Sequence, residues 1–277
     1  MKVVRTVADV RAARAAFPAL GLVPTMGFLH QGHVSLIEQA KRDCGAVAVS
    51  IFVNPTQFAA NEDLSRYPRD LDRDLAMLDD AAVDLAFVPE VDQIYPSGFT
   101  TSIDVGPVAT VLEGASRPGH FAGVATVVAK LFNIIQPTRA YFGQKDAQQC
   151  VVIKRMVRDL DLPVEVIVRP TIRDANGLAV SSRNSYLTPA EHEQAAVLYR
   201  ALCAANAAFA AGERTAAVLR GIMADAIAAE PAVRLDYVSV ADPETLAECQ
   251  LAGRGAILSL AAFLGKTRLI DNILLGE

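Results

Sequence analysis

Two histidines three positions apart, His30 and His33, are the residues of this chain whose types and spacing best suit chemistry on a nucleotide. The apolar run Leu20–Val23 before them predicts a short buried strand, and the amphipathic segment 33–43 predicts a helix. The histidines then flank a helix N-terminus, where free backbone N–H groups and the helix dipole favour an anion. Glycines that would let phosphates approach the backbone stand at Gly27 and Gly32. This combination favours a nucleotide site over an ordinary turn in which one histidine caps its helix.

Lys145 and Asp146 form a second candidate group, because they follow the strand expected at 139–142 and open the helix expected at 146–159. A lysine at such a point can reach a triphosphate, while Asp146 can cap the helix or hold a ribose hydroxyl or a metal ion. Alone, the pair would indicate only a capped helix with an exposed lysine. In one crevice with the two histidines, it becomes a candidate phosphate-binding group.

The segment Ser181–Asn184 offers two hydroxyls, a guanidinium group and several backbone donors within four residues. These groups suit the oxygens of a polyphosphate. The alternative is a surface loop whose serines cap the helix expected from Pro189, but Thr188 is a better cap for that helix. We therefore expect the loop to close on ATP from a domain hinge and to shield a reactive intermediate from water.

Neutral amides provide a fourth group of candidates, at Asn54, Gln57 and Gln149, which all follow predicted strand ends. Amides can hold a hydroxyl and a carboxylate without adding charge. Five aspartates of the helix expected at 69–82 are interpreted mainly as a solvated face, with a minor chance that one contacts Mg²⁺. They are Asp70, Asp72, Asp74, Asp79 and Asp80.

The elements that must position these residues alternate between strands and helices in the first ~170 residues. Apolar runs predict strands at 20–23, 46–53, 84–88, 139–142 and 164–168, and helical patterns fall at 33–43, 69–82, 119–135 and 146–159. Such alternation predicts a Rossmann-like, doubly wound parallel sheet whose ligands bind beyond the carboxyl ends of its strands. We expect this nucleotide-binding domain to span residues 1–171.

A second, smaller α+β domain is expected over residues 172–277. Its sequence begins with a turn-rich stretch at Arg173–Gly177 and continues with two alanine-rich helical segments, at 189–211 and 214–230. Strand-like runs at 234–240, 255–262 and 268–275 predict a sheet that is at least partly antiparallel.

Composition narrows the class of protein. The chain has 277 residues, 52% of them hydrophobic, and a formal net charge of -5, which argues against nucleic acid as a partner. The four cysteines, at 44, 150, 203 and 249, form no CxxC pair, so no zinc cage or disulfide framework is indicated. Charged residues interrupt every early apolar stretch, and no run approaches the ~18 residues that cross a bilayer. We expect a cytoplasmic protein with no membrane partner.

Together these motifs resemble the pantoate–β-alanine ligase family, within the HxGH nucleotidylyltransferase superfamily, almost from end to end. The HxGH motif alone indicates only the superfamily. Together with NPTQF, GQKDAQQ and SSRN in this order, it resembles the pattern of the ligase family alone. The matching blocks are Pro24–His33, Ser50–Phe58, Tyr67–Arg69, Gly119–Val124, Phe142–Gln149, Gly177–Leu187 and Arg268–Asn272.

The resemblance implies a homodimer that uses ATP and Mg²⁺ in two steps. Pantoate attacks the α-phosphate to give pantoyl adenylate and pyrophosphate, and β-alanine then displaces AMP. It implies catalytic roles for His30, His33, Lys145 and Arg183, with His33 as the acid, and pantoate contacts for Gln57 and Gln149, the former beside β-alanine. The implied ATP contacts are Met26, Gly27, Phe28, Leu29, His30, Gln31, Gly32, His33, Gly143, Gln144, Lys145, Asp146, Ile172, Val180, Ser181, Ser182 and Arg183.

Two positions depart from the family pattern: Gln144 stands where many members carry Glu, and Val180 where Met is common. Both would alter the fit to adenine or ribose more than the chemistry. One alternative is an HxGH adenylyltransferase for a phosphorylated metabolite, but the neutral amides on the acceptor side favour pantoate. Another is a non-catalytic nucleotide-binding module, against which the intact histidines, lysine and SSRN loop argue.

Overall fold

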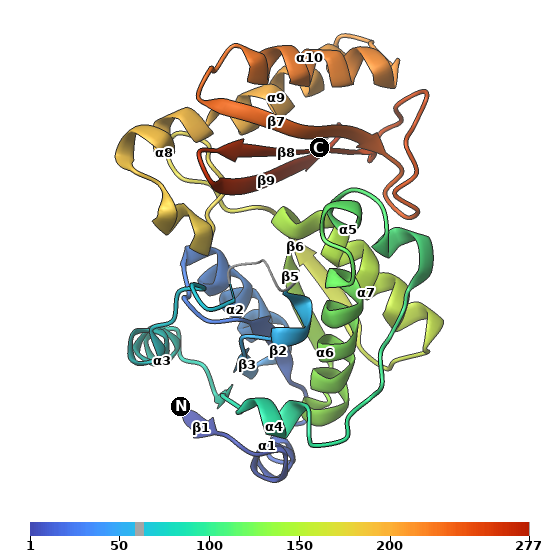
Figure 1. Cartoon of the computed structure of the whole chain (residues 1–277). Coiled ribbons are helices and arrows are strands. Elements are labelled where there is room, and N and C mark those ends of the chain that lie inside the picture. The colour runs from blue at the N-terminus through green and yellow to red at the C-terminus, as the bar shows by residue number, and fades with distance from the viewer. Residues whose placement is uncertain (59–63, 277) are drawn as a thin grey trace. The chain divides into compact units, whose positions relative to one another are not determined.

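The computed structural model describes residues 1–58 and 64–276, which pack as two compact units (Figure 1). Unit 1 consists of Met1–Gly143 and Val152–Arg169, and unit 2 of Gln144–Val151 and Pro170–Glu277. A single boundary at 171/172 was expected, whereas here Gln144–Val151 belongs to the second unit and the later boundary lies at 169/170. The reason is local, because hydrogen bonds tie Gln144 and Lys145 to Asn272 of unit 2.

Unit 1 contains a six-stranded sheet in which every neighbouring pair is parallel, in the order β1-β4-β3-β2-β5-β6. Its strands are β1 Lys2–Val4, β2 Gly21–Thr25, β3 Val47–Ile51, β4 Leu85–Phe87, β5 Arg139–Gly143 and β6 Glu165–Arg169. Strands β2, β3 and β4 follow one another toward one edge of the sheet, and β5 and β6 follow one another toward the other edge. The topological switch point therefore lies between β2 and β5. The predicted doubly wound parallel sheet is confirmed, with the edge strand β1 as an addition.

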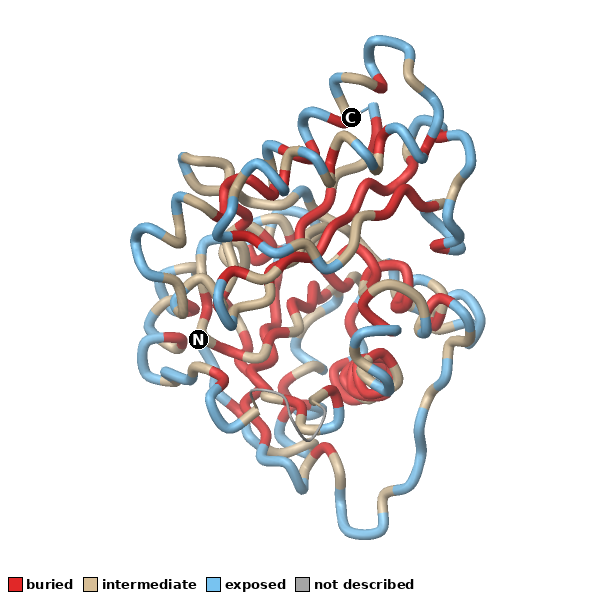
Figure 2. Tube along the Cα trace, turned by 45° about the horizontal axis from the view of Figure 1, so that its top comes forward, coloured by how far each residue is buried: buried red, intermediate tan, exposed pale blue. Residues whose placement is uncertain are grey.

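The helices of unit 1 are α1 Val7–Arg14, α2 Gln31–Cys44, α3 Leu71–Asp80, α4 Val91–Ile94, α5 Glu113–Ser116 and α6 His120–Ile135, with 3-10 turns η1 Pro55–Gln57 and η2 Gly106–Ala109. Apolar residues of α2 and α3 pack with Val47, Val49 and Ile51, the alternate residues of β3 that point to one face of the sheet. On the other face lies α6, most of whose residues are buried (Figure 2). Helix α7, Ala147–Asp159, passes from unit 2 into unit 1.

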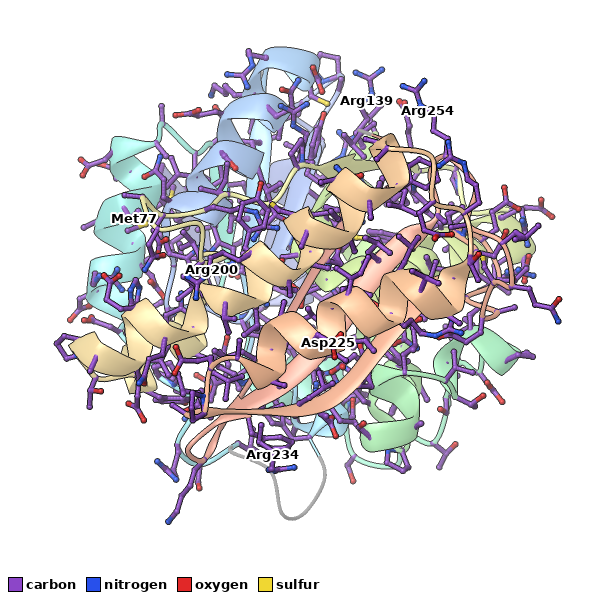
Figure 3. All side chains as sticks on the ribbon, turned by 90° about the horizontal axis from the view of Figure 1, so that it is seen from above. Met77, Arg139, Arg200, Asp225, Arg234 and Arg254 are labelled. Carbon is purple, nitrogen blue, oxygen red and sulfur yellow. The ribbon has the colours of Figure 1, made fainter. Side chains whose placement is uncertain are left out.

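Unit 2 is built on the antiparallel sheet β7-β8-β9, with β7 Val233–Ala241, β8 Ile257–Leu264 and β9 Thr267–Leu274. Its helices are α8 Pro189–Ala195, α9 Val197–Ala210 and α10 Ala216–Ala228, and its 3-10 turns are η3 Gln144–Asp146 and η4 Ser182–Tyr186. Helices α9 and α10 cover one face of the sheet and share an apolar core with it, while Arg200 and Asp225 lie on the exposed side (Figure 3). The smaller α+β domain is thus confirmed.

The first alanine-rich segment forms two helices, α8 and α9, which meet at Ala196. Thr188 caps α8 as expected, in a capping box with Glu191. Within residues 1–58 and 64–276, no helix has both the length and the apolar character needed to cross a membrane.

Candidate active site

The turn between β2 and α2 brings His30 and His33 together. His30 is the N-cap of α2, and its Nδ1 accepts a hydrogen bond from Gly32 N at 3.2 Å. His33 reaches back, and its Nδ1 accepts from His30 N, also at 3.2 Å. The two ring centroids are 4.1 Å apart. The capping role and the paired arrangement therefore coexist, because the Nδ1 atom of each histidine holds the turn.

The hydrogen bonds determine which nitrogen of each ring carries the proton. An Nδ1 atom that accepts a backbone N–H bond is unprotonated, so the proton of the ring is on Nε2. Burial and the neighbouring His30 lower the pKa of His33 from 6.5 to about 3. His33 is therefore neutral at pH 7 and still presents an Nε2–H donor. Such a donor can stabilise charge on a phosphate oxygen.

Asp74 holds the residues just before the histidines, which corrects its interpretation as part of a solvated face. Its side chain is 1% exposed and accepts hydrogen bonds at 2.7 Å from the backbone N–H groups of Phe28 and Leu29. Asp70 caps α3 and is exposed, as are Asp72, Asp79 and Asp80. Asp74 lies three residues after Leu71 and four before Leu78, so it shares the inner face of α3. That position is the signal by which the sequence could have revealed it.

A strained backbone explains why the turn needs this support. Phe28 has φ of 51° and Gly27 has φ of 83°, and a Cβ at Gly27 would lie 3.0 Å from Asp74 Oδ2. Arg73 adds a hydrogen bond to Leu29 O at 3.0 Å, and its guanidinium lies 5.0 Å from the centroid of the Phe28 ring. Burial raises the pKa of the Asp74 carboxyl, an effect that its two N–H bonds oppose. Three further expected ATP contacts lie in the same connection between β2 and α2. They are Met26, which follows β2, and Gln31 and Gly32, which open α2.

The neutral amides of unit 1 form a second part of the site, after β3. Asn54 and Gln57 are 1% and 8% exposed, and Asn54 Nδ2 donates to Gln57 Oε1 at 3.1 Å. Gln57 Nε2 donates in turn to Met26 Sδ at 2.9 Å, which joins the amide pair to the histidine turn. A buried amide pair whose partners are mostly neutral can bind a small polar acceptor without a net charge of its own.

Residues that the sequence did not single out hold this amide pair in place. Tyr95 Oη donates to Asn54 Oδ1 at 2.8 Å, and Gly123 O accepts from Asn54 Nδ2 at 3.2 Å. The backbone oxygen of Gln57 lies 2.8 Å from His120 Nδ1 and accepts from Arg117 at 3.3 Å. His120 lies in the matched block Gly119–Val124, which was its only signal in the sequence, whereas Arg117 lies just before that block.

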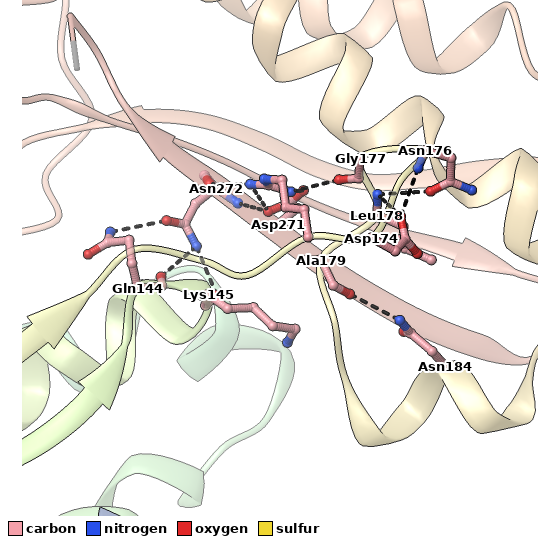
Figure 4. Close-up of polar contacts among 11 residues, drawn as sticks. Gln144, Lys145, Asp174, Asn176, Gly177, Leu178, Ala179, Asn184, Asp271 and Asn272 are labelled. Carbon is pink, nitrogen blue, oxygen red and sulfur yellow. Dashed lines mark hydrogen bonds and ion pairs between the residues drawn. The ribbon is translucent and has the colours of Figure 1, made fainter. Parts of the chain in front are cut away.

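The candidates of unit 2 include the short helix η3, which follows Gly143 at the end of β5. Lys145 Nζ lies 3.6 Å from Asp146 Oδ1, and both side chains remain partly exposed. Asn272 of β9 donates through Nδ2 to Gln144 O at 3.0 Å and to Lys145 O at 2.8 Å (Figure 4). Gln149 lies on α7 and is partly buried. The loop that carries Lys145 is therefore fixed to β9 through its main chain.

The other candidates of unit 2 lie on the strand-like segment that leads into η4. Val180 N donates to Ile172 O at 2.9 Å, so these two expected ATP contacts are neighbours. Ser181 is the N-cap of η4 and accepts from Arg183 N at 3.3 Å, whereas Ser182 is buried. Asn184 Nδ2 donates to Ala179 O at 3.0 Å (Figure 4). Backbone and side-chain bonds thus hold the SSRN loop in a defined conformation.

Magnesium does not have a protein-built site among the described residues, where no three histidine, cysteine or acidic side chains gather. Asp74 accepts two backbone N–H bonds, Asp271 is paired with Arg173, and Asp146 lies 3.6 Å from Lys145 Nζ. These donors do not fit a resident Mg²⁺ site of several protein ligands.

Comparison with known proteins gives a consistent result over the whole length of the chain. The model of the family described as pantoate-beta-alanine ligase matches residues 2–274. The pantothenate synthetase of Chloroflexus aurantiacus is 61% identical over 276 residues, covering 99% of this chain and 98% of that protein. That of Moorella thermoacetica is 54% identical over 280 residues, covering 99% of each chain.

Solved structures agree with the sequence relatives. Pantothenate synthetase from Thermus thermophilus superposes with a TM-score of 0.95 at 50% identity, covering 99% of both chains. A pantoate-beta-alanine ligase from Francisella tularensis, solved with a beta-gamma ATP and beta-alanine, gives 0.83 at 36% identity, covering 100% of this chain and 98% of that one. With this fold, these motifs and relatives along its full length, the chain belongs to the pantoate–β-alanine ligase family.

Proposed function

We propose that this chain joins pantoate to β-alanine in an ATP-dependent reaction with a pantoyl-adenylate intermediate. In the first step the pantoate carboxylate attacks the α-phosphorus of ATP, and pyrophosphate leaves. In the second step the amine of β-alanine attacks the acyl carbon, the amine loses a proton, and AMP leaves. Family membership supports the overall reaction, and the paired histidines at the N-terminus of α2 are the observation that carries the adenylation step.

We assign His30 and His33 to the phosphates of ATP. The Nδ1 atoms of both rings hold the turn, and the Nε2–H of His33 is a donor for the phosphates. Joining two anions requires donors aimed at the charge that develops around the α-phosphate. His33 acts here as a neutral donor in the free enzyme, because its pKa is about 3. A bound triphosphate would favour the protonated ring, which is the form that could act as an acid.

Asn54 and Gln57 are assigned to the acceptor substrate, together with Gln149. Pantoate carries hydroxyl groups and one carboxylate, which neutral amides can bind by hydrogen bonds. The buried contact between Gln57 and Met26 supports this assignment, because it places the amides beside the turn that bears the histidines. A phosphorylated acceptor would call for cations aimed at its phosphate, whereas the nearby Arg117 donates to the backbone oxygen of Gln57. This chemistry favours pantoate over the alternative of a phosphorylated metabolite.

The candidates of unit 2, together with Gly143 at the end of β5, are assigned to ATP. Lys145 and Arg183 supply positive charge, Ser181 and Ser182 supply hydroxyls, and Gly143, Gln144, Asp146, Ile172 and Val180 complete the proposed contacts. The lysine acts as a point charge and the arginine as a planar donor for phosphate oxygens. We further propose that the active form is a homodimer and that Mg²⁺ enters with the nucleotide. Light scattering checks the first proposal, and activity measured with EDTA and then with added Mg²⁺ checks the second.

Exchange of labelled pyrophosphate into ATP tests the proposed reaction. We expect exchange that requires pantoate and proceeds without β-alanine, because the first step is reversible and independent of the amine. His33→Ala should lower the exchange rate by about 100-fold, since one preorganised donor contributes this much in comparable sites. Its circular dichroism spectrum should match that of the wild type.

The same assay separates the alternatives. Exchange that ignores pantoate but responds to a phosphorylated acceptor would favour an adenylyltransferase of that other kind. Complete absence of AMP formation with both substrates present would indicate a nucleotide-binding module without catalysis. Wild-type exchange in the His33→Ala variant would remove His33 from the mechanism.

A further inference from the structure

The side chain of Asn272, on β9, forms hydrogen bonds with residues outside its own sheet. Its side chain is 4% exposed, and both of its N–H bonds go to consecutive carbonyls, Gln144 O at 3.0 Å and Lys145 O at 2.8 Å. Its Oδ1 accepts from Gln144 Nε2 at 3.1 Å. Every polar atom of this amide is therefore used to hold one turn, η3, which is distant from it by more than a hundred residues in sequence (Figure 4).

The two carbonyls lie beyond the end of a strand ladder. The last paired residues of β5 and β6 are Gly143 and Arg169, so sheet pairing ends before Gln144. An amide side chain is the one uncharged group that can donate two hydrogen bonds from a single nitrogen and accept another through its oxygen. Asn272 thus determines the path of the main chain at the residue that bears the Lys145 ammonium group.

A buried ion pair holds Asn272 in turn. Asp271 is 2% exposed and forms two bonds with Arg173, from Nη1 to Oδ2 at 2.6 Å and from Nη2 to Oδ1 at 2.9 Å. Arg173 also donates to Asn272 O at 3.3 Å and to Gly177 O at 3.1 Å, and its guanidinium stacks on Tyr199 at 3.8 Å from the ring centroid. The strand β9 is therefore joined on one side to η3 and on the other to the Gly177 turn that precedes the SSRN loop.

We propose that Asn272 is a positioning residue for adenylation, which acts by holding the main chain of Gln144 and Lys145 so that the Lys145 ammonium group is preorganised for the phosphates of ATP. The inference rests on the proposed function, because it assumes that Lys145 binds ATP. Asn272 touches no substrate. Its removal costs activity only through Lys145, since the lysine side chain then samples more positions than the one that stabilises the transition state.

The test is a double-mutant cycle between Asn272→Ala and Lys145→Ala, measured by pantoate-dependent pyrophosphate exchange. We expect Asn272→Ala to lower kcat/KM for ATP by about tenfold and to leave KM for β-alanine unchanged, because the three side-chain hydrogen bonds to η3 are lost. In the Lys145→Ala background the same change should cost less than about twofold, because the group through which it acts is gone. Asn272→Asp, which keeps the side-chain volume but loses both donors, should also lower kcat/KM for ATP.

Two control variants separate positioning from general destabilisation. Leu269→Ala removes a buried side chain of the same strand that has no bond to η3, and Ser259→Ala changes the residue paired with Asn272 on β8, whose Oγ has no partner among the described residues. Leu269→Ala should lower the melting temperature and Ser259→Ala should not, while both keep kcat/KM for ATP at 25 °C.

The outcomes also distinguish the inference from the proposed function. A wild-type enzyme without pantoate-dependent exchange contradicts the proposed function. An active wild type in which Lys145→Ala is impaired but Asn272→Ala keeps wild-type kinetics overturns the inference alone. Equal losses from Asn272→Ala in both lysine backgrounds, or an equal loss in Leu269→Ala, also overturn it, because a merely structural residue would behave in that way.

Discussion

At the scale of single residues, His33 combines a structural bond with a chemical role. Its Nδ1 closes the turn and its burial keeps the ring neutral, with a pKa of about 3. The ring has its ordinary pKa of 6.5 in the unfolded chain, so between pH 6.5 and 3 the unfolded state binds more protons than the folded one. With respect to His33, the free energy of unfolding is therefore highest above pH 6.5, and it decreases as the pH falls from 6.5 toward 3.

This difference predicts how the pH dependence of stability changes in His33→Asn, whose amide oxygen can still accept from His30 N. If His33 keeps its full pKa shift, the wild type loses about 2 kcal/mol of its free energy of unfolding between pH 6.5 and pH 5. Partial exposure of the ring reduces this loss to about 1 kcal/mol. Urea unfolding of the wild type and of His33→Asn, each at pH 7 and pH 5, measures the loss. The variant should lose less stability on acidification, and equal losses would mean that His33 titrates normally in the folded state.

The residues that sequence alone could identify are those whose roles depend on local context. His30, His33 and the SSRN loop lie within short segments with a definite spacing, and each of these segments forms a capped turn in the structure. The positioning contacts of Asp74 and Asn272 could not be predicted, because the partners of each are 45 or more residues away along the chain. Only the folded chain brings each residue to its own partners, although an aspartate on the inner face of α3 was a detectable anomaly.

At the scale of elements, the contact between α6 and η1 governs the amide pair. A Cβ at Gly123 would collide with Thr56 O and would lie 2.8 Å from Gln57 N, both of them backbone atoms. Gly123→Ala should therefore displace η1, lower stability by about 1–3 kcal/mol and raise KM for pantoate several-fold. Steady-state kinetics and urea unfolding measure the two effects.

Gly221→Ala is the matched control for this substitution. Gly221 lies within α10, is exposed, and has no atom within 4 Å of an added Cβ among the described residues. Alanine has the higher helix propensity, so this variant should gain up to about 1 kcal/mol and keep its KM for pantoate. An unchanged KM in Gly123→Ala would show that the close packing of α6 on η1 does not position Gln57.

The type of an element could be predicted where the spacing of its apolar residues and its length indicated the same kind of structure. Strands β2, β3 and β5 are examples. Finer features depended on tertiary packing. The expected strand at 46–53 ends at Ile51, because Asn54 turns the chain into η1 through its bond with Thr56 N. The alanine-rich segment breaks at Ala196, although alanine is the best helix former. Helix propensity alone therefore cannot reveal such a break.

At the scale of the whole molecule, the chain passes between the units three times, at 143/144, 151/152 and 169/170. Unit 2 therefore depends on Gln144–Val151, which a division at one hinge would assign to unit 1. The sequence indicated a single domain boundary, after Pro170, where the alternation of strands and helices gives way to a turn-rich segment. The short helix η3 has no hydrophobic periodicity of its own that could have indicated another boundary. Only its bonds with Asn272 reveal to which unit it belongs.

Separate cores predict separate local unfolding. Ile37 lies in the α2–α3 core of unit 1 and Leu202 in the α9–α10 core of unit 2, and both are 0% exposed. Truncating either to alanine should cost about 2–5 kcal/mol within its own unit. Leu202→Ala should accelerate amide hydrogen exchange in β8 while leaving β3 protected, and Ile37→Ala should do the reverse, because exchange reports the stability of each cooperative unit. Arg200→Ala, an exposed change on α9, should alter neither strand (Figure 3). If each core variant accelerated exchange equally in β3 and β8, the two units would unfold as one, and their packing into distinct cores would have no thermodynamic counterpart.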